Sequence, residues 1–127
     1  MRLLPLLASL LVLPQIALSD VNLVMAEEPG CIYCARWNEE IAEAYPKTAE
    51  GRAAPLVRYD LQRDPAPAEL SSRVIFTPTF LLVRDGVEID RLEGYPGEDF
   101  FWGLLGQMLD RADVPLDNVP LVSETSE

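Results

Sequence analysis

The sequence predicts an α/β domain with a mixed four-stranded sheet, composed of a βαβ unit, a β-hairpin and a C-terminal helix. Three observations support this fold class. An apolar strand pattern at residues 20–26 leads into an amphipathic helix pattern, the pair Asp85-Gly86 separates two strand-like runs, and a broad apolar helix face follows at residues 98–109. With the intervening runs, the expected order of elements is β, α, β, short α, β, β, α.

Residues 1–19 have the features of a secretory signal sequence. Arg2 supplies a short positive region, residues 3–13 form an apolar run, and Ala17-Leu18-Ser19 is a small-x-small cleavage site. The apolar run is shorter than the roughly 20 residues that a transmembrane helix needs. We therefore expect cleavage after Ser19 and export to an oxidising compartment, with an uncleaved membrane anchor as the alternative.

The chain is organised around two cysteines that follow the first strand. Residues 20–26 alternate briefly and then run apolar, as in a strand inside a sheet, and a turn at residues 27–30 leads into Cys31 and Cys34. A cysteine at the start of a helix is close to unpaired N–H groups and to the positive end of the helix dipole, which favour its thiolate. Cys34 follows on the same side of the first turn, where it can displace a mixed disulfide formed by Cys31.

The spacing of the cysteines leaves two interpretations. In an exported protein, the pair is either a structural disulfide or a redox centre. A bridge between cysteines separated by two residues closes so short a loop that it restricts the unfolded chain very little. The spacing therefore favours thiol–disulfide chemistry over a structural bridge.

An amphipathic helix is expected to contain the second cysteine. Its apolar positions are Cys34, Trp37, Ile41, Ala44 and Tyr45. Pro46 is expected to end this helix, and residues 47–54 to form a polar link to the next strand. Trp37 lies on the apolar stripe, so we expect it in the core rather than in a binding role.

The remaining pattern completes the expected sheet and ends in a helix. In order, we expect a strand at 55–60, a turn at 64–67, a short helix at 68–73, and hairpin strands at 80–83 and 87–92. Glu98 and Asp99 favour the start of a last helix, whose apolar face we expect in the core. That face consists of Phe100, Phe101, Leu104, Leu105, Met108 and Leu109. The folded domain is expected to span residues 20–110, followed by a flexible acidic tail at 111–127.

Composition excludes several classes of function. The 127 residues include two cysteines and no histidine, so neither a Cys–His or Ser–His–Asp site nor a one-chain zinc site with about four Cys or His ligands can be built. With 10 Lys and Arg against 21 Asp and Glu, the formal net charge is −11. This charge argues against binding nucleic acid and favours a cationic or neutral partner. We expect no cofactor and no metal.

One segment resembles a known active site. Residues 28–37, which contain both cysteines, resemble the active-site segment of SoxS-type periplasmic thioredoxins, encoded with bacterial sulfur-oxidation systems. The wider resemblance to the thioredoxin superfamily covers residues 20–110, and Phe76–Phe80 adds to the narrower one. The resemblance implies a thioredoxin fold and a periplasmic location.

The resemblance also implies roles for particular residues. Cys31 matches the attacking cysteine and Cys34 the resolving one. Pro78 matches a cis-proline that faces the disulfide, with Thr77 immediately before it. In the family, the backbone beside this proline pairs with an extended substrate segment, so Thr77 and Pro78 are expected to bind substrate.

The segment departs from ordinary thioredoxins, which carry Trp-Cys-Gly-Pro-Cys. Gly30 replaces the Trp, Ile32 and Tyr33 replace Gly-Pro, and Met25 falls where a buried aspartate lies in the family. Ile32 and Tyr33 would form an apolar and aromatic docking patch for a protein partner; the alternative is that Tyr33 packs onto the domain.

Without the buried aspartate, the proton acceptor for Cys34 is open. Water, Glu27 and Glu28 are the candidates, although two adjacent glutamates before Pro-Gly are usually part of a solvated turn. A carboxylate close to Cys31 would oppose its thiolate.

The first functional hypothesis is an exported thiol–disulfide oxidoreductase. The resemblance implies that it acts as a reductant. It also implies a substrate, the carrier cysteine of a thiosulfate-oxidising complex (a SoxY-type protein), and a membrane electron donor of the CcdA or DsbD type. The second hypothesis is a general periplasmic oxidase, isomerase or cytochrome-maturation reductase. The third is a binding module of the same fold in which the cysteine pair is a stable, non-catalytic disulfide.

Overall fold

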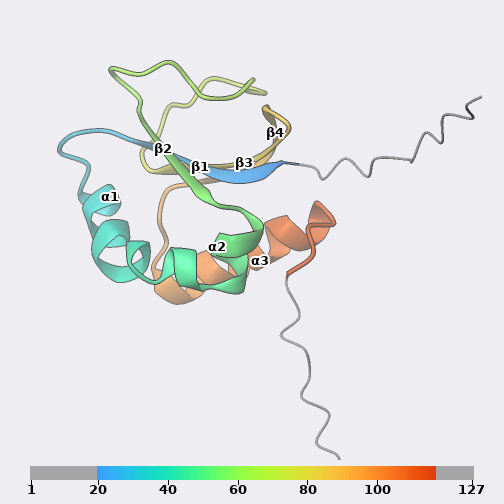
Figure 1. Cartoon of the computed structure of the whole chain (residues 1–127). Coiled ribbons are helices and arrows are strands. Elements are labelled where there is room, and N and C mark those ends of the chain that lie inside the picture. Colours follow the sequence, from blue (N-terminus) through green and yellow to red (C-terminus); the bar gives the residue numbers. More distant parts are fainter. Residues whose placement is uncertain (1–19, 117–127) are drawn as a thin grey trace, which may run out of the picture.

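The computed structural model describes residues 20–116, so the signal sequence predicted at 1–19 and residues 117–127 of the predicted tail lie outside the described part (Figure 1). The helices and strands, in chain order, are β1 (Val21–Glu27), α1 (Ile32–Trp37), the π-helical turn η1 (Asn38–Ala42), the 3-10 turn η2 (Tyr45–Lys47), α2 (Ala49–Ala53), β2 (Leu56–Asp60), β3 (Thr79–Arg84), β4 (Val87–Glu93) and α3 (Glu98–Arg111).

The four strands form one mixed sheet in the order β2-β1-β3-β4. β1 runs parallel to β2 and antiparallel to β3, and β3 pairs with β4 as a hairpin. Asp85 and Gly86 form the hairpin turn with φ of 51° and 80°. Positive φ at both central residues is the backbone twist that a tight two-residue hairpin needs. The predicted fold class and hairpin are confirmed.

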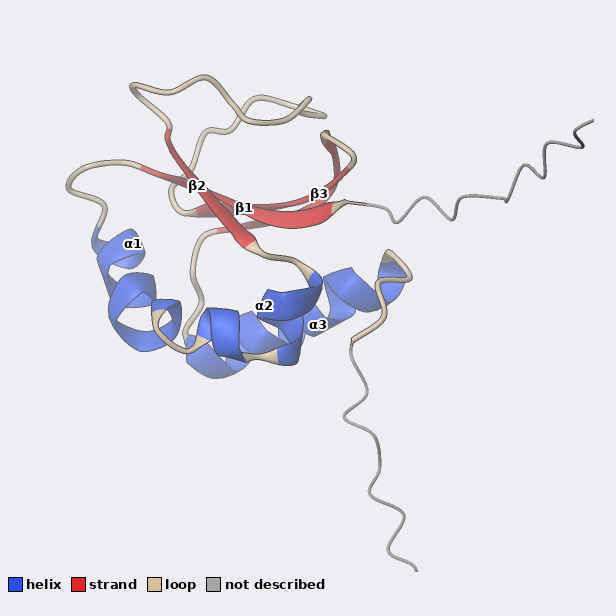
Figure 2. Cartoon of the chain, viewed as in Figure 1, coloured by secondary structure: helices blue, strands red, loops and turns tan. Residues whose placement is uncertain are grey.

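The helices cover one face of the sheet (Figures 1 and 2). Between them and the sheet lies an aromatic core around Trp37, whose ring centroid is 5.3 Å from that of Phe80 and 5.9 Å from that of Phe101. Trp37 is fully buried, as expected from the apolar stripe of its helix. The junction between β1 and α1 is therefore supported by this densely packed aromatic core.

The opposite face is covered by the irregular segment 61–78 rather than by a helix (Figure 2). The short helix predicted at 68–73 is therefore wrong. The N–H of Glu69 donates to Gly86 O at 2.8 Å, and the N–H of Glu88 donates to Glu69 O at 2.9 Å. Because the backbone groups of Glu69 bond to the hairpin turn and to β4, they are not free for the bonds of a local helix.

The helical half differs from the prediction in its connections. The helix that begins at α1 ends with η1 at Ala42, before Pro46, and Ala44 is exposed. The predicted polar link contains η2 and α2. Thr48 caps α2, since its hydroxyl accepts from the N–H of Gly51 at 3.0 Å. A five-residue helix has too few positions to produce a recognisable hydrophobic period.

The last helix, α3, is buried along a narrower face than predicted. Phe101, Leu105, Met108 and Leu109 are buried and Leu104 is half-buried, but the side chain of Phe100 is 70% exposed, so its assignment to the core is wrong. The described structure continues past residue 110, where Val114 packs against the core. Within residues 20–116, no helix has both the length and the hydropathy to cross a membrane.

Candidate active site

The cysteines lie where β1 ends and α1 begins. Cys31 is the N-cap of α1, and its Sγ accepts from the N–H of Cys34 at 3.1 Å. The two residues are joined by a disulfide with their Cα atoms 5.2 Å apart. Cys34 is 4% exposed, whereas Cys31 is half-buried at the surface. A second molecule can therefore reach the sulfur of Cys31 more readily than that of Cys34.

The turn before the cysteines depends on glycine. Gly30 has φ of +81°, a conformation that residues with a Cβ atom adopt only with strain. The N–H of Cys31 then donates to Glu28 O at 3.3 Å. A glycine therefore suits this position, where the backbone turns from β1 into α1.

The second part of the site is the segment before β3. The Thr77–Pro78 peptide bond is cis, as expected. The hydroxyl of Thr79 donates to Phe76 O at 2.6 Å, and the N–H of Gly94 donates to Pro78 O at 2.7 Å. Hydrogen bonds on both sides thus fix the backbone around Pro78.

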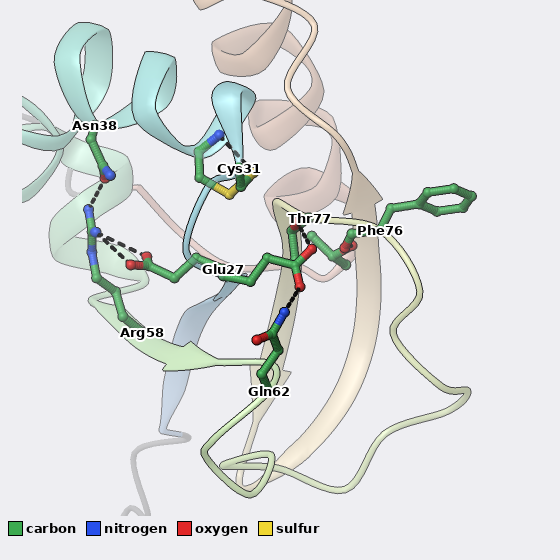
Figure 3. The surroundings of a disulfide bond; sticks show 10 residues. Glu27, Cys31, Asn38, Arg58, Gln62, Phe76 and Thr77 are labelled. Atoms are coloured by element: carbon green, nitrogen blue, oxygen red, sulfur yellow. Dashed lines mark hydrogen bonds and ion pairs between the residues drawn. A yellow bond between two sulfur atoms is a disulfide. The ribbon is translucent and has the colours of Figure 1, made fainter.

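Glu28 joins this segment to the cysteine turn. Its Oε1 accepts from the Thr77 hydroxyl at 2.8 Å, and its Oε2 accepts from Nε2 of Gln62 at 3.0 Å (Figure 3). Glu28 is half-buried rather than a freely solvated turn residue. Residues 28, 62 and 77, which are far apart in the sequence, therefore meet next to the cysteines.

Glu27 points to a different partner. Its Oε2 lies 3.0 Å from Nη1 of Arg58, and the same guanidinium donates to Oδ1 of Asn38 at 2.5 Å (Figure 3). Arg58 also lies over the ring of Trp37, 5.4 Å from its centroid. Arg58 on β2 thus ties the end of β1 to the helical layer, and Glu27 is paired with it.

The base of the site is apolar. Met25, at the position of the buried aspartate of ordinary thioredoxins, is fully buried and belongs to the same core cluster as Cys34. A carboxylate does not occupy this position, so the proton of Cys34 must leave by another route.

Large apolar side chains are exposed on both segments. Ile32 is 74% exposed and Tyr33 54%, so neither side chain is packed into the core. On the segment before the cis-proline, Ile75 is 71% exposed and Phe76 57%, and Phe76 projects away from the fold (Figure 3). Ile75 and Phe76 are candidate site residues that the sequence did not single out. The sequence feature that could have indicated them is a pair of large apolar residues directly before Thr-Pro that fits neither a helical nor a strand periodicity.

A groove of about 580 Å³ lies beside α1, between Tyr33 and Arg36 on one side and the 92–96 segment on the other. Tyr95 forms part of its wall and donates its hydroxyl hydrogen bond to Glu40. Burial, and next this bond, raise the pKa of Tyr95 well above its usual value. Tyr95 is thus a neutral hydrogen-bond donor at neutral pH.

Comparison with known proteins identifies the domain. A family model described as "Thioredoxin-like domain" matches residues 19–109. Among solved structures, the chain is similar to the periplasmic thioredoxin SoxS from Paracoccus pantotrophus in its reduced form, with 55% identity over 73% of this chain and 99% of that one, and a TM-score of 0.69. A comparison with curated proteins gives no match.

Proposed function

The chain belongs to the thioredoxin-like family and is a thiol–disulfide oxidoreductase, and from this premise we propose that it acts as a periplasmic reductant of a partner protein's cysteine. The observation that carries the exchange chemistry is the difference between the two sulfurs, whereas the direction of electron flow rests on the similarity to SoxS. Cys31 is reachable at the surface and caps a helix, whereas Cys34 is 4% exposed behind it. This arrangement suits an attacking thiol and a resolving thiol.

The reaction needs only the two cysteines. The Cys31 thiolate attacks one sulfur of the substrate disulfide and forms a mixed disulfide, and the other substrate sulfur leaves as a thiolate that takes up a proton. Cys34 then loses its proton and attacks Sγ of Cys31, which releases the second substrate thiolate. The enzyme dithiol is oxidised to the disulfide, and the substrate disulfide is reduced to two thiols.

The substrate side of the site is proposed to consist of two exposed segments. Ile32 and Tyr33 would contact the partner on one side of Cys31, and the backbone of Thr77 and Pro78 would pair with an extended partner chain on the other. The exposure of Ile32 supports this role, because a large apolar side chain that is 74% exposed contributes little to the packing of the core. A protein or peptide substrate fits such a surface better than a small polar molecule.

The finer identity of the partners comes from the SoxS resemblance. We propose that the substrate is the carrier cysteine of a thiosulfate-oxidising complex of the SoxY type, kept active by reduction. A membrane protein of the CcdA or DsbD type would return electrons to the oxidised enzyme. The 55% identity to a periplasmic thioredoxin SoxS supports this assignment.

The reduction potential tests the direction of electron flow. The protein is equilibrated in glutathione or dithiothreitol buffers, and its thiols are trapped by alkylation. A potential of about −250 mV or lower, with rapid alkylation of Cys31, is the expected result. A potential near −120 mV would instead make the protein an oxidase or isomerase, and a cysteine pair that does not exchange would leave only the binding module.

A trapping experiment tests the partner. In Cys34→Ser, the mixed disulfide cannot be resolved, so a complex of the enzyme with a SoxY-type carrier whose cysteine is blocked by a disulfide should persist on a non-reducing gel. Cys31→Ser is the matched control and should trap nothing. Trapping by Cys31→Ser alone would reverse the proposed roles of the two sulfurs.

We also propose that residues 1–19 direct export and are removed after Ser19. Mass spectrometry of the protein from the periplasmic fraction checks this directly. The expected mature protein begins at Asp20 and carries the acidic tail to residue 127. An intact N-terminus in the membrane fraction would support the uncleaved anchor instead.

A further inference from the structure

Glu28 connects the cysteine turn to the segment that contains Thr77 and Pro78. Its backbone oxygen accepts from the N–H of Cys31 at 3.3 Å, so Glu28 belongs to the cysteine turn. Its carboxylate accepts from the Thr77 hydroxyl at 2.8 Å, across a sequence separation of 49 residues (Figure 3). One residue therefore links the turn that holds the attacking sulfur to the segment that holds Pro78.

The segment that contains Thr77 lacks the support of regular structure. Residues 61–78 form neither a helix nor a strand, and at their end Ile75 and Phe76 are exposed. The carboxylate of Glu28 is held in turn by Nε2 of Gln62, from the beginning of the same segment, at 3.0 Å. Glu28 thus binds both ends of this segment at the cysteine turn.

We propose that Glu28 is a positioning residue for disulfide exchange: its carboxylate holds the Thr77 hydroxyl, so that the backbone of Thr77 and Pro78 keeps its place beside Cys31 when a substrate chain docks. The inference rests on the proposed docking along Thr77 and Pro78, but not on the direction of electron flow. A side-chain hydrogen bond contributes enough free energy to matter for the alignment of a segment that has no regular secondary structure.

The role predicts a selective defect. A small neutral disulfide needs only the sulfur of Cys31, whereas a protein disulfide must also be aligned along Thr77 and Pro78. The test therefore compares the reduction rates of insulin and of bis(2-hydroxyethyl) disulfide by the full-length chain and its variants. The measured quantity is the ratio of the two second-order rate constants.

Glu28→Ala should lower this ratio about tenfold, and Thr77→Val, which removes the donor from the other side, should lower it by a similar factor. The double variant should be no worse than either single one, because both remove the same bond. Glu28→Gln keeps an oxygen acceptor for the Thr77 hydroxyl and should restore the ratio to within about twofold. Glu39→Ala removes an equal charge from an exposed position on η1 and is the control.

The outcomes separate the inference from the function beneath it. An unchanged ratio in Glu28→Ala, together with a lowered ratio in Phe76→Ser, would overturn the role of Glu28 and leave the docking surface in place. An unchanged ratio in both would overturn the docking itself. A defect in Glu28→Gln as large as that in Glu28→Ala would mean that the charge matters rather than the bond to Thr77, which also contradicts the proposal.

Discussion

At the scale of single residues, two buried tyrosines couple the stability of the domain to high pH. The hydroxyl of Tyr45 donates to Ala54 O at 2.7 Å, and that of Tyr95 donates to Glu40. Burial raises the pKa of both phenols, and nearby carboxylates add to the effect. A phenol whose pKa is higher in the folded state binds its proton more tightly there, so its contribution to stability is complete below the unfolded value of about 10 and is lost as the pH rises above it.

We therefore expect the free energy of unfolding to fall above pH 10, and Tyr95→Phe to reduce that fall. One such group changes the slope by at most about 1.4 kcal/mol per pH unit. Urea unfolding of both proteins at several pH values from 8 to 11.5 measures the two slopes. At pH 8, the variant should be less stable by about 1 kcal/mol, because the bond to Glu40 is lost. Equal slopes above pH 10 would show that Tyr95 does not contribute.

The residues of the site differ in how well the sequence predicts them. The local spacing of Cys31 and Cys34 is enough to predict thiol–disulfide chemistry. The cis bond before Pro78 was predicted from the family resemblance. The bond between Glu28 and Thr77 could not be predicted, because it joins residues 49 positions apart and leaves no periodic pattern. A long-range polar contact depends on the folded path of both segments, which the order of the elements does not define.

At the scale of the elements, Gly51 allows the helix α2 to lie very close to the 3-10 turn η2. A Cβ atom at Gly51 would lie 1.8 Å from the backbone oxygen of Tyr45 in η2. We expect Gly51→Ala to lower the free energy of unfolding by about 3 kcal/mol, since a backbone group must move to relieve the overlap. Gly103 in α3 is the matched control, because a Cβ there meets nothing within 4 Å.

Gly103→Ala should stabilise the protein by about 0.5–1 kcal/mol, since alanine favours a helix interior more than glycine does. The same substitution is thus expected to have opposite signs in two helices, and urea unfolding distinguishes them. Destabilisation of similar size in both variants would mean that the close approach at Gly51 does not decide the result.

The irregular segment 61–78 is attached to β4 by hydrogen bonds to a buried ion pair that lies within that strand. Arg91 donates from Nε to Glu88 Oε1 at 2.9 Å and from Nη2 to Ser72 O at 2.8 Å, and Ser71 also donates to Glu88. The Glu88 side chain is 2% exposed and that of Arg91 16%. These bonds replace the helix that we expected at 68–73. Local propensity could not predict them, because the partners lie on a strand that follows later in the chain.

Glu88→Ala should therefore destabilise the domain by about 2–4 kcal/mol, because it leaves a mostly buried guanidinium without its main partner. It should also increase the rate of proteolysis within the segment. Glu93→Ala removes the other carboxylate near Arg91, at 3.6 Å and 47% exposed, and should cost less than about 1 kcal/mol. Similar losses in the two variants would contradict the special role of the buried pair.

At the scale of the whole molecule, the order of the elements was enough to predict the sheet. A βαβ unit, a hairpin and a last helix leave few ways to place four strands, since parallel neighbours need a crossover and antiparallel ones a short turn. The sequence does not specify that the helices lie on one face only, because segment 61–78 has apolar residues that either a helix or a loop can bury. Its covering role depends on the hydrogen bonds to Glu88 and Arg91 together with buried apolar side chains such as Val74.

The net charge of −11 belongs to the same scale, because it acts on a partner before any contact forms. We expect the protein to reduce a disulfide peptide with several lysines faster than an acidic peptide of equal length at low salt. Raising the ionic strength from about 0.02 M to 0.5 M shortens the screening length from about 20 Å to about 4 Å. The rate with the lysine-containing peptide should therefore fall severalfold and the rate with the acidic peptide should rise severalfold, so that the two rates converge. A neutral peptide is the control and should change little. Stopped-flow measurements give the rates at each salt concentration. If the two rates still differ at high salt, the preference comes from local contacts beside Cys31 and not from the charge of the whole molecule.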